Sequence, residues 1–357
     1  MKCDILFSKY TEFKKGRNSS YGGINFVKVF HIGKVGNVEK YSSEGSFLAG
    51  LELVDAPHGL SDDEYIRLGK DADFLIADAI SPVSAYLIGG MPHLKLIHSE
   101  GVAFNAIDTA AAAGRGIYVC NSSGMNATAV AEQALLLMLG MVKNVVVNDK
   151  AVREGRQIEV KGGYMQRGDL MELADFSVGL VGFGDIAVET ARLLRAFGVE
   201  NIFYNKRKPL AASEENALGV QYMELDELLG SSDIVSLHLP LNEQTKGMVN
   251  EEFFSGMREG SFFVNTARGE LVDDKALIRA LESGKLKMAG LDTVSNEPVK
   301  AEHELLNLPE EISGKILFSP HIGGITAASF RRSYAMISED IEDVANGRRP
   351  RRVVNNM

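Results

Sequence analysis

Three residues with side chains suited to catalysis lie in the second half of the chain: Arg268, Glu297 and His321. Each comes after a short apolar run that predicts a buried strand. These runs are 261–265, 288–291 and 316–318. In an open parallel sheet, ligands bind beyond the carboxyl ends of the strands, so we expect the three side chains to share one crevice. A guanidinium that holds a carboxylate, and an imidazole that moves a proton near neutral pH, are what reversible reduction of a 2-oxo acid requires.

A glycine-rich turn, Gly182-Phe-Gly-Asp-Ile-Ala187, follows a predicted strand at 178–181 and begins a predicted helix. Gly182 suits a sharp turn. Gly184 lets backbone approach a pyrophosphate at the helix N-terminus, where free N–H groups and the helix dipole favour anions. Ala187 is a permitted variant of the third glycine position. A second strand ends at Asn205, where the ribose-reading residue of a dinucleotide site belongs. We therefore predict a dinucleotide site.

The remaining elements alternate between strand and helix, which predicts parallel, doubly wound sheets. The first strand is predicted at 2–7 or, equally well, at 26–32. If it is 26–32, the segment before it in residues 1–23 would be an added edge strand or an arm reaching a partner subunit. Further strands are predicted at 51–54, 74–77, 94–98, 117–120, 200–205 and 233–238. A nearly all-apolar helix between Asn126 and Lys143 should be buried. Residues 148–175 are interpreted as loop and linker, and 327–345 as a helix returning to the first domain.

Composition narrows the class of protein. The 357 residues allow two domains, and 45% apolar with 24% charged residues is typical of a soluble globular protein. The net charge of -10 argues against a nucleic-acid partner, so the basic cluster at 348–352 is interpreted as a solvated tail. Cys3 and Cys120 are too few for a disulfide framework, and no apolar run reaches the length of a membrane span. We expect a cytoplasmic protein without a membrane partner or targeting segment.

In their joint order and spacing, these motifs resemble those of the D-isomer-specific 2-hydroxyacid dehydrogenases, over residues 50 to 345. The matching segments are Leu94-Lys-Leu-Ile-His-Ser-Glu-Gly-Val-Ala-Phe-Asn-Ala-Ile-Asp108, Val130-Ala-Glu132, Gly182-Phe-Gly-Asp-Ile-Ala187, His238-Leu-Pro240, Asn265-Thr-Ala-Arg-Gly269, Asp292 with Glu297-Pro298, and Ser319-Pro-His-Ile-Gly323. The resemblance implies an α/β fold of two doubly wound parallel-sheet domains. Residues 1–124 and 325–357 would form a flavodoxin-like substrate domain, and 125–324 a Rossmann-type dinucleotide-binding domain.

The resemblance also implies roles for individual residues. His321 would be the general acid that protonates the substrate carbonyl oxygen, and the base in the reverse direction. Glu297 would bind the far ring nitrogen and favour the imidazolium. Arg268 would hold the substrate carboxylate and carbonyl oxygen, with backbone N–H groups near Val102 and Ala103 completing the carboxylate site. Taken singly, each has an alternative structural explanation: His321 could be a histidine in a Pro-Gly loop, Glu297 an N-cap before a proline turn, and Arg268 a surface ion-pair partner.

The cofactor contacts implied by the resemblance come from the glycine turn and from the strand ends beside it. They are Gly182, Gly184, Asp185, Ile186, Asn205, Lys206, Arg207, His238, Leu239, Pro240, Thr245, Thr266, Ala267 and Asp292. Asp292 would receive the nicotinamide carboxamide. No metal is expected.

The sequence departs from the family pattern at several positions. Many members carry an acid at the end of the second strand, where this chain has Asn205 followed by Lys206, Arg207 and Lys208. Loss of the acid removes repulsion of a 2′-phosphate and the cations attract it, so NADP is favoured over NAD as cofactor, with a basic solvated turn as the alternative.

Two further departures affect anion binding. Ala103 and Asn105 stand where the family often has glycine and aspartate, and Glu100 adds a negative charge that could narrow the carboxylate site. Asp185 suits the dipole of its helix but would repel a phosphate.

We expect an oxidoreductase that transfers a hydride between NAD(P)H and a small 2-oxo acid such as glyoxylate or hydroxypyruvate, giving a D-2-hydroxy acid. One alternative is a 3-phosphoglycerate-type dehydrogenase, disfavoured because no regulatory domain follows residue 350 and no extra phosphate-binding cluster is evident. Another is a dinucleotide-sensing binding protein like the family's corepressor relatives. The resemblance further implies a homodimer formed through the long helix after Asn126, and segments at 121–126 and 322–326 suggest a hinge that closes on substrate.

Overall fold

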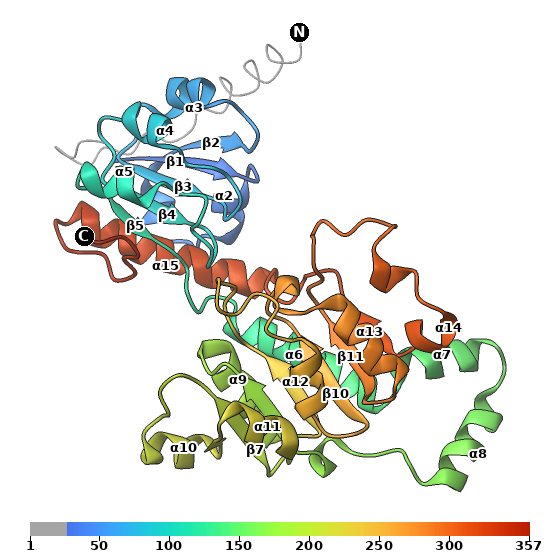
Figure 1. The fold of residues 1–357 in the computed structure, drawn as a ribbon. Helices are drawn as coiled ribbons and strands as arrows, with labels where there is room; N and C mark the ends of the chain where they lie inside the picture. The colour runs from blue at the N-terminus through green and yellow to red at the C-terminus, as the bar shows by residue number, and fades with distance from the viewer. Residues whose placement is uncertain (1–26) are drawn as a thin grey trace. The chain divides into compact units, whose positions relative to one another are not determined.

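The computed structural model describes residues 27–357, which form two compact units, each built on one parallel sheet (Figure 1). The first unit runs to Asn121 and resumes at Ile337–Met357, and the second is Ser122–Met336. The division near the C-terminus therefore falls within helix α15 (Ala327–Ala345), later than the predicted division at 324/325. The alternative first strand at 2–7 lies outside the described residues.

The first unit has a five-stranded sheet in the order β2-β1-β3-β4-β5, with every neighbouring pair parallel. Its strands are β1 (Lys28–Gly33), β2 (Glu52–Pro57), β3 (Phe74–Ala77), β4 (Leu96–Ser99) and β5 (Tyr118–Cys120). Its helices are α2 (Asn37–Tyr41), η2 (Leu48–Gly50), α3 (Asp62–Gly69), α4 (Ala85–Gly89) and α5 (Thr109–Gly114), together with the end of α15. Helices α3, α4 and α5 lie along one face (Figure 1). This strand order is flavodoxin-like, as predicted.

The second unit has a seven-stranded parallel sheet in the order β12-β11-β10-β9-β6-β7-β8. Its strands are β6 (Val178–Val181), β7 (Ile202–Asn205), β8 (Gln221–Tyr222), β9 (Ile234–Leu237), β10 (Ser261–Asn265), β11 (Leu286–Leu291) and β12 (Ile316–Phe318). The order reverses between β6 and β9, which makes the carboxyl end of β6 the switch point where a Rossmann-type sheet binds its ligand. The predicted fold class is confirmed.

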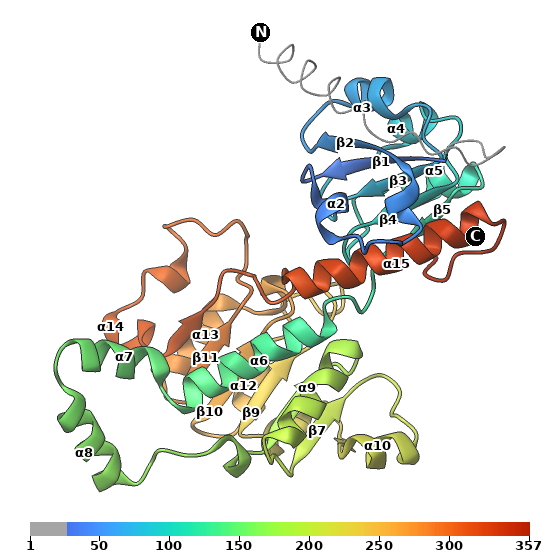
Figure 2. The same ribbon diagram turned by 180° about the vertical axis from the view of Figure 1, so that it is seen from behind.

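Helices cover both faces of this second sheet. The helices α6 (Ala127–Val142), α9 (Asp185–Ala196) and α10 (Ala212–Leu218) are on the face turned toward the viewer in Figure 2. The opposite face carries α11 (Leu225–Ser231), α12 (Glu251–Gly256) and α13 (Asp274–Glu282). Because both faces are covered, strands β6, β9 and β10 are buried at every residue. The short η3 (Leu173–Asp175), η4 (Gly269–Leu271), η5 (Glu304–Leu306) and α14 (Glu310–Ser313) complete the unit.

The prediction that 148–175 is loop and linker is wrong, because this segment contains most of two helices, α7 (Val145–Arg153) and α8 (Gln157–Arg167). Two of its glycines end helical segments instead of interrupting them: Gly155 and Gly168 have φ values of 78° and 65°, the left-handed conformation common just after a helix. An ion pair between Arg153 and Asp149, at 2.7 Å, adds local support within α7. No single helix of the described residues is long and apolar enough to cross a membrane, although α6 and α7, bent by 56°, meet that test together.

The basic cluster at 348–352 is largely solvent-exposed, as predicted, but it is not a free tail. Arg348 pairs with Asp343 at 2.7 Å, and Arg352 pairs with Asp340 at 3.1 Å. Beyond them, the N–H of Val354 donates to the carbonyl oxygen of Val119 at 2.8 Å, so the chain end joins the edge strand β5. The physical reason is the acidic side of α15, which faces these arginines and neutralises them.

Candidate active site

The glycine turn has the shape that close approach of a dinucleotide requires. Gly182 has a φ of 89°, and a Cβ there would lie 2.5 Å from the carbonyl oxygen of His238, so only glycine fits without rearrangement. Gly184 is the N-cap of α9, and no side chain forms a capping hydrogen bond there. Nothing lies within 4 Å of the place that a Cβ on Gly184 would occupy. The space beside Gly184, at the start of α9, is therefore open, as an anion site at a helix N-terminus needs.

Polar atoms without partners gather at the strand ends beside this turn. Nδ1 of His238, Oγ1 of Thr266 and Oγ1 of Thr293 are buried and have no hydrogen-bond partner among the described residues. Burial lowers the pKa of His238 to about 4, so its imidazole is neutral at pH 7, and its Nε2 lies 3.0 Å from Oγ of Ser236. Buried polar groups are normally satisfied, so these atoms fit a ligand with amide and hydroxyl groups. The sequence motifs did not indicate Thr293, although it directly follows Asp292.

The other predicted cofactor residues lie in the first turn of α9 and in the loops after β7, β9 and β10 of the second unit. Asn205 ends β7 and donates from Nδ2 to the carbonyl oxygen of Met223 at 2.9 Å, with Lys206 and Arg207 following it. Oγ1 of Thr245 donates to the carbonyl oxygen of Pro240 at 2.7 Å, which closes the loop after β9. The first turn of α9 carries Asp185, which is exposed, and Ile186, which is half-buried; Leu239 and Ala267 line strand ends.

The structure brings Glu297 and His321 into direct contact. Nδ1 of His321 lies 2.6 Å from Oε2 of Glu297, and Oε1 of Glu297 accepts the N–H of Val294 at 3.1 Å. The two side chains remain 33% and 44% exposed, Glu297 and His321 respectively, so the pair is open to an incoming molecule. The pairing leaves Nε2 as the ring nitrogen available for proton exchange.

Asp292 holds the loop that carries His321. The carboxylate is 2% exposed; Oδ1 accepts the N–H of Ile322 at 3.1 Å and Oδ2 accepts the N–H of Gly323 at 2.9 Å. Oγ of Ser319 also donates to Oδ1, and Nε2 of Gln133 donates to that Oγ at 2.8 Å. These bonds hold His321 in a left-handed backbone conformation with a φ of 54°. The sequence offered no signal for Gln133, which is brought there only by the packing of α6.

Arg268 follows β10 with an exposed side chain that forms no ion pair within the described part of the chain. Nη1 donates to the carbonyl oxygen of Ala267 at 2.6 Å, and the carbonyl oxygen of Arg268 itself accepts from Nδ2 of Asn265 at 2.9 Å. The next residue, Gly269, packs on the Glu297 loop, since a Cβ there would lie 2.0 Å from the carbonyl carbon of Val294. The guanidinium is thus anchored at its base and available to an anion.

Val102 and Ala103 belong to the first unit, in the loop after β4. Nδ2 of Asn121 donates to the carbonyl oxygen of Val102 and Oγ of Ser99 to that of Ala103, each at 2.6 Å. Both carbonyl groups are therefore engaged, and no hydrogen bond is formed by either N–H within the described residues. Nearby Glu100 is buried, and its Oε1 accepts from Nδ2 of Asn37 at 3.1 Å.

Within residues 27–357, no group of three or more His, Cys, Asp or Glu side chains is arranged to hold a metal ion.

Comparison with known proteins defines the class. Residues 135–323 match the family model described as D-isomer specific 2-hydroxyacid dehydrogenase, NAD binding domain. The chain belongs to this family, and it is an NAD(P)-dependent D-2-hydroxyacid dehydrogenase that acts on the CH–OH group of its donor. The predicted family and enzyme class are confirmed.

Among individual relatives, a glyoxylate reductase of Thermofilum pendens is 33% identical over 83% of this chain and 85% of its own length. A hydroxypyruvate reductase of Thermotoga maritima is 35% identical over 79% of this chain and 87% of its own length. The crystal structure of apo D-mandelate dehydrogenase from Rhodotorula graminis is 28% identical with a TM-score of 0.78, covering 93% of this chain and 99% of that one.

Proposed function

We propose that this dehydrogenase is an NADP(H)-preferring reductase of small 2-oxo acids, with glyoxylate and hydroxypyruvate as the first candidates. The observation that carries the proposal is the 2.6 Å contact between Nδ1 of His321 and Glu297. The Glu297 loop packs against the loop of Arg268, whose guanidinium forms no ion pair within residues 27–357. The relatives named glyoxylate reductase and hydroxypyruvate reductase support the choice of substrates.

In the proposed reaction, the bound dinucleotide supplies the hydride that reaches the carbonyl carbon. Nε2 of His321 gives its proton to the carbonyl oxygen, so that C=O becomes CH–OH, and the histidine takes the proton back in the opposite direction. Glu297 fixes the ring tautomer through Nδ1 and stabilises the imidazolium by its charge. Arg268 binds the carboxylate and the carbonyl oxygen with two N–H groups, as a planar guanidinium can. The N–H groups of Val102 and Ala103 are proposed to bind the same carboxylate.

The cofactor preference is argued from the end of β7. Neutral Asn205 carries no charge that would repel a 2′-phosphate, and Lys206 and Arg207 supply cations beside it. The remaining predicted contacts, from Gly182 and Gly184 to Asp292, are proposed as dinucleotide contacts of the second unit. The first unit is correspondingly proposed to be the substrate domain.

A homodimer is part of the proposal. Helices α7 and α8, which follow α6, expose apolar side chains that a partner would cover: Val146 is 61% exposed, and Ile158 and Met165 are each 76% exposed. A large apolar patch on a protein surface commonly marks an interface with a partner. Sedimentation velocity is expected to give twice the mass of 38.8 kDa, and a monomer would contradict this part of the proposal.

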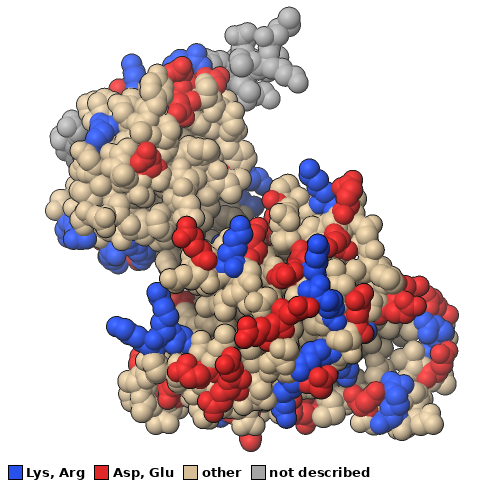
Figure 3. Space-filling view, in the orientation of Figure 1, with Lys and Arg blue, Asp and Glu red and all other residues tan. Residues whose placement is uncertain are grey.

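A cytoplasmic location, with neither nucleic acid nor membrane as a partner, is also proposed. The net charge is -10, and on the face drawn in Figure 3 cations and carboxylates alternate over the second unit. A phosphate backbone instead requires clustered cations.

The test is an oxidation assay with NADPH and NADH across glyoxylate, hydroxypyruvate, pyruvate, phenylglyoxylate and 3-phosphohydroxypyruvate. We expect turnover of the two smallest candidates with a higher kcat/KM for NADPH, and loss of turnover in His321→Ala with dinucleotide binding retained. A preference for NADH would overturn the cofactor proposal. Tight dinucleotide binding without turnover of any 2-oxo acid would favour a dinucleotide-sensing role.

A further inference from the structure

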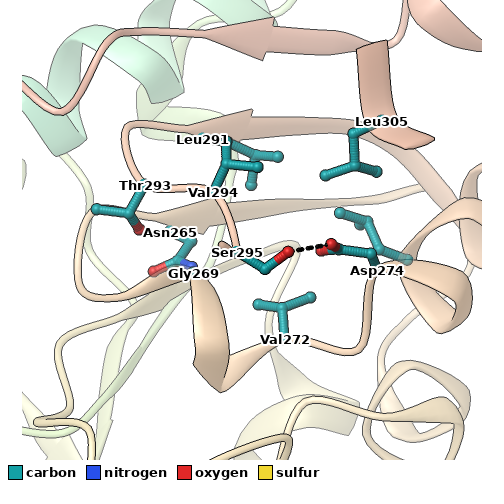
Figure 4. A pocket seen from close by; sticks show the side chains of 10 residues that line it. Asn265, Gly269, Val272, Asp274, Leu291, Thr293, Val294, Ser295 and Leu305 are labelled. Carbon is teal, nitrogen blue, oxygen red and sulfur yellow. Dashed lines mark hydrogen bonds between the residues drawn. The ribbon is translucent and has the colours of Figure 1, made fainter. Parts of the chain in front are cut away.

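A buried polar cluster lies behind the loop that carries Glu297. Oγ of Ser295 donates to Oδ2 of Asp274, and the same Oγ lies 3.1 Å from Nε2 of His303. His303 and Asp274 are 3.6 Å apart, with side chains 9% and 10% exposed. Figure 4 shows Ser295 and Asp274 meeting in the pocket that Gly269, Val294 and Leu305 also line. The proposed reaction uses none of the three polar residues.

The cluster joins the loop to two separate elements. Asp274 is the first residue of α13, and His303 precedes η5. The N–H of Leu305 donates to Nδ1 of His303 at 3.3 Å, so the ring proton resides on Nε2 and points toward Ser295. The hydrogen bonds therefore run in one direction, from His303 to Ser295 and from Ser295 to Asp274. The Ser295 hydroxyl is fixed because it both accepts and donates a hydrogen bond.

Ser295 is close to Glu297 in the chain and is tied to it through the turn. The residue between them, Asn296, has a left-handed backbone with a φ of 57°, and its Nδ2 donates to Oγ of Ser295 at 3.3 Å. The residue before Ser295 supplies the N–H that binds Oε1 of Glu297 at 3.1 Å. Glu297 is 33% exposed and has only Val294 and His321 as partners in the described residues, so the turn determines where its carboxylate points.

The same turn also packs against the loop of Arg268. A Cβ on Gly269 would come within 2.2 Å of the backbone nitrogen of Ser295, so the two backbones touch with no space for adjustment. Movement of Ser295 would therefore disturb the base of Arg268 as well as the orientation of Glu297.

We propose that Asp274, Ser295 and His303 are positioning residues that lock the Glu297 turn and, through Glu297, select the tautomer of His321. The proposal rests on the proposed roles of Glu297 and His321. None of the three touches the reacting atoms. Their effect is geometric, because a displacement of the order of an ångström at a catalytic group can lower the rate by about a hundredfold.

The main variant is Ser295→Ala, which removes the hydroxyl and adds no bulk. We expect kcat to fall by about tenfold to a hundredfold while the Kd for NADPH stays within about twofold of the wild type. Asp274→Asn keeps an acceptor for Ser295 and should retain more activity than Asp274→Ala. Ser283→Ala is the matched control, since Ser283 donates to the carbonyl oxygen of Ala280 at the other end of α13; it should leave kcat unchanged.

Two readouts separate positioning from general damage. In a double-mutant cycle, Ser295→Ala should add little to Glu297→Gln, because both act through one carboxylate. Independently of turnover, nitrogen NMR of labelled histidines, assigned with His321→Gln, should show the Nδ1–H tautomer of His321 in the wild type and its loss in Ser295→Ala and Glu297→Gln.

The outcomes are distinguishable. If Glu297→Gln changes neither kcat nor the tautomer, the proposed function of Glu297 fails. If Glu297→Gln changes both but Ser295→Ala and Asp274→Ala change neither, the positioning role is overturned. Full additivity in the cycle, with an unchanged tautomer, would also overturn it. If Ser295→Ala does not fold, the Asp274→Asn and Asp274→Ala comparison decides by the same two readouts.

Discussion

Gly182 and Gly184, in the turn proposed to bind the pyrophosphate, should respond differently to the same substitution. Gly182 has a φ of 89°, and its added methyl group would lie 2.5 Å from the carbonyl oxygen of His238. A non-glycine residue in this conformation costs about 1–3 kcal/mol, and overpacking costs about 1–3 kcal/mol more. Gly184 has a φ of -104°, and its methyl group would meet nothing within 4 Å. Only the first substitution should therefore destabilise the protein itself.

The expected result follows from these magnitudes. Gly182→Ala should lower the melting midpoint of the second unit by about 5 to 15 °C without cofactor, at about 2–4 °C for each kcal/mol in a domain of this size. Gly184→Ala should leave the midpoint within about 2 °C. It should nevertheless weaken NADPH binding by about tenfold or more, since its methyl group would occupy the space proposed for the pyrophosphate.

Differential scanning fluorimetry without cofactor gives the first quantity, and quenching or enhancement of NADPH fluorescence gives the second. Equal melting midpoints for Gly182→Ala and the wild type would refute the packing argument. Wild-type NADPH affinity in Gly184→Ala would refute the placement of the pyrophosphate at the N-terminus of α9.

Three further predictions concern other residues of the site. Arg268→Lys should lower kcat/KM for the 2-oxo acid by about a hundredfold to a thousandfold and leave the Kd for NADPH unchanged, because a lysine cannot form two parallel hydrogen bonds. Steady-state kinetics test this prediction. A loss of less than fivefold would contradict it. Replacing Lys206 and Arg207 together by alanine should reduce kcat/KM with NADPH about tenfold or more and leave that with NADH nearly unchanged; equal losses with both cofactors would count against the NADP proposal. Because burial lowers the pKa of His238 to about 4 from 6.5, the unfolded chain binds more protons between these values. His238 should thus contribute stability above pH 6.5 that is lost as the pH falls toward 4, by up to about 3 kcal/mol, and urea unfolding at pH 7 and pH 5 should show a smaller difference in His238→Asn.

The sequence was sufficient for the parts of the fold that follow from periodicity and glycine placement. The strand 178–181, the glycine turn and the following helix are present where predicted, because a buried strand, a left-handed Gly182 and an open helix N-terminus each need particular residue types. The contact between Glu297 and His321 was expected because both follow parallel strands of one sheet. Neither of these predictions requires knowledge of how distant segments of the chain pack together.

Other features depend on packing that a single sequence does not display. Helix α8 was missed because Gly162 and Gly163 lie inside it, although its end is set by the left-handed Gly168. The partners of Arg348 and Arg352 are acids on α15, which only the fold places beside them. Gln133 likewise reaches Ser319 from a helix far away in the chain. In each case the residue type was compatible with several environments, and tertiary contacts selected one.

The carboxylate of Asp292 would link the proposed cofactor recognition to the proposed acid–base chemistry in one side chain. Two donors occupy Oδ1 and one occupies Oδ2, and a carboxylate offers roughly four acceptor positions, so a single position remains for an incoming amide. An asparagine there would present its own NH₂ group to backbone donors and release the histidine segment. Kinetic defects at this position would therefore report proton transfer and nicotinamide orientation together, and the enzyme could not adjust one by mutation of Asp292 without altering the other.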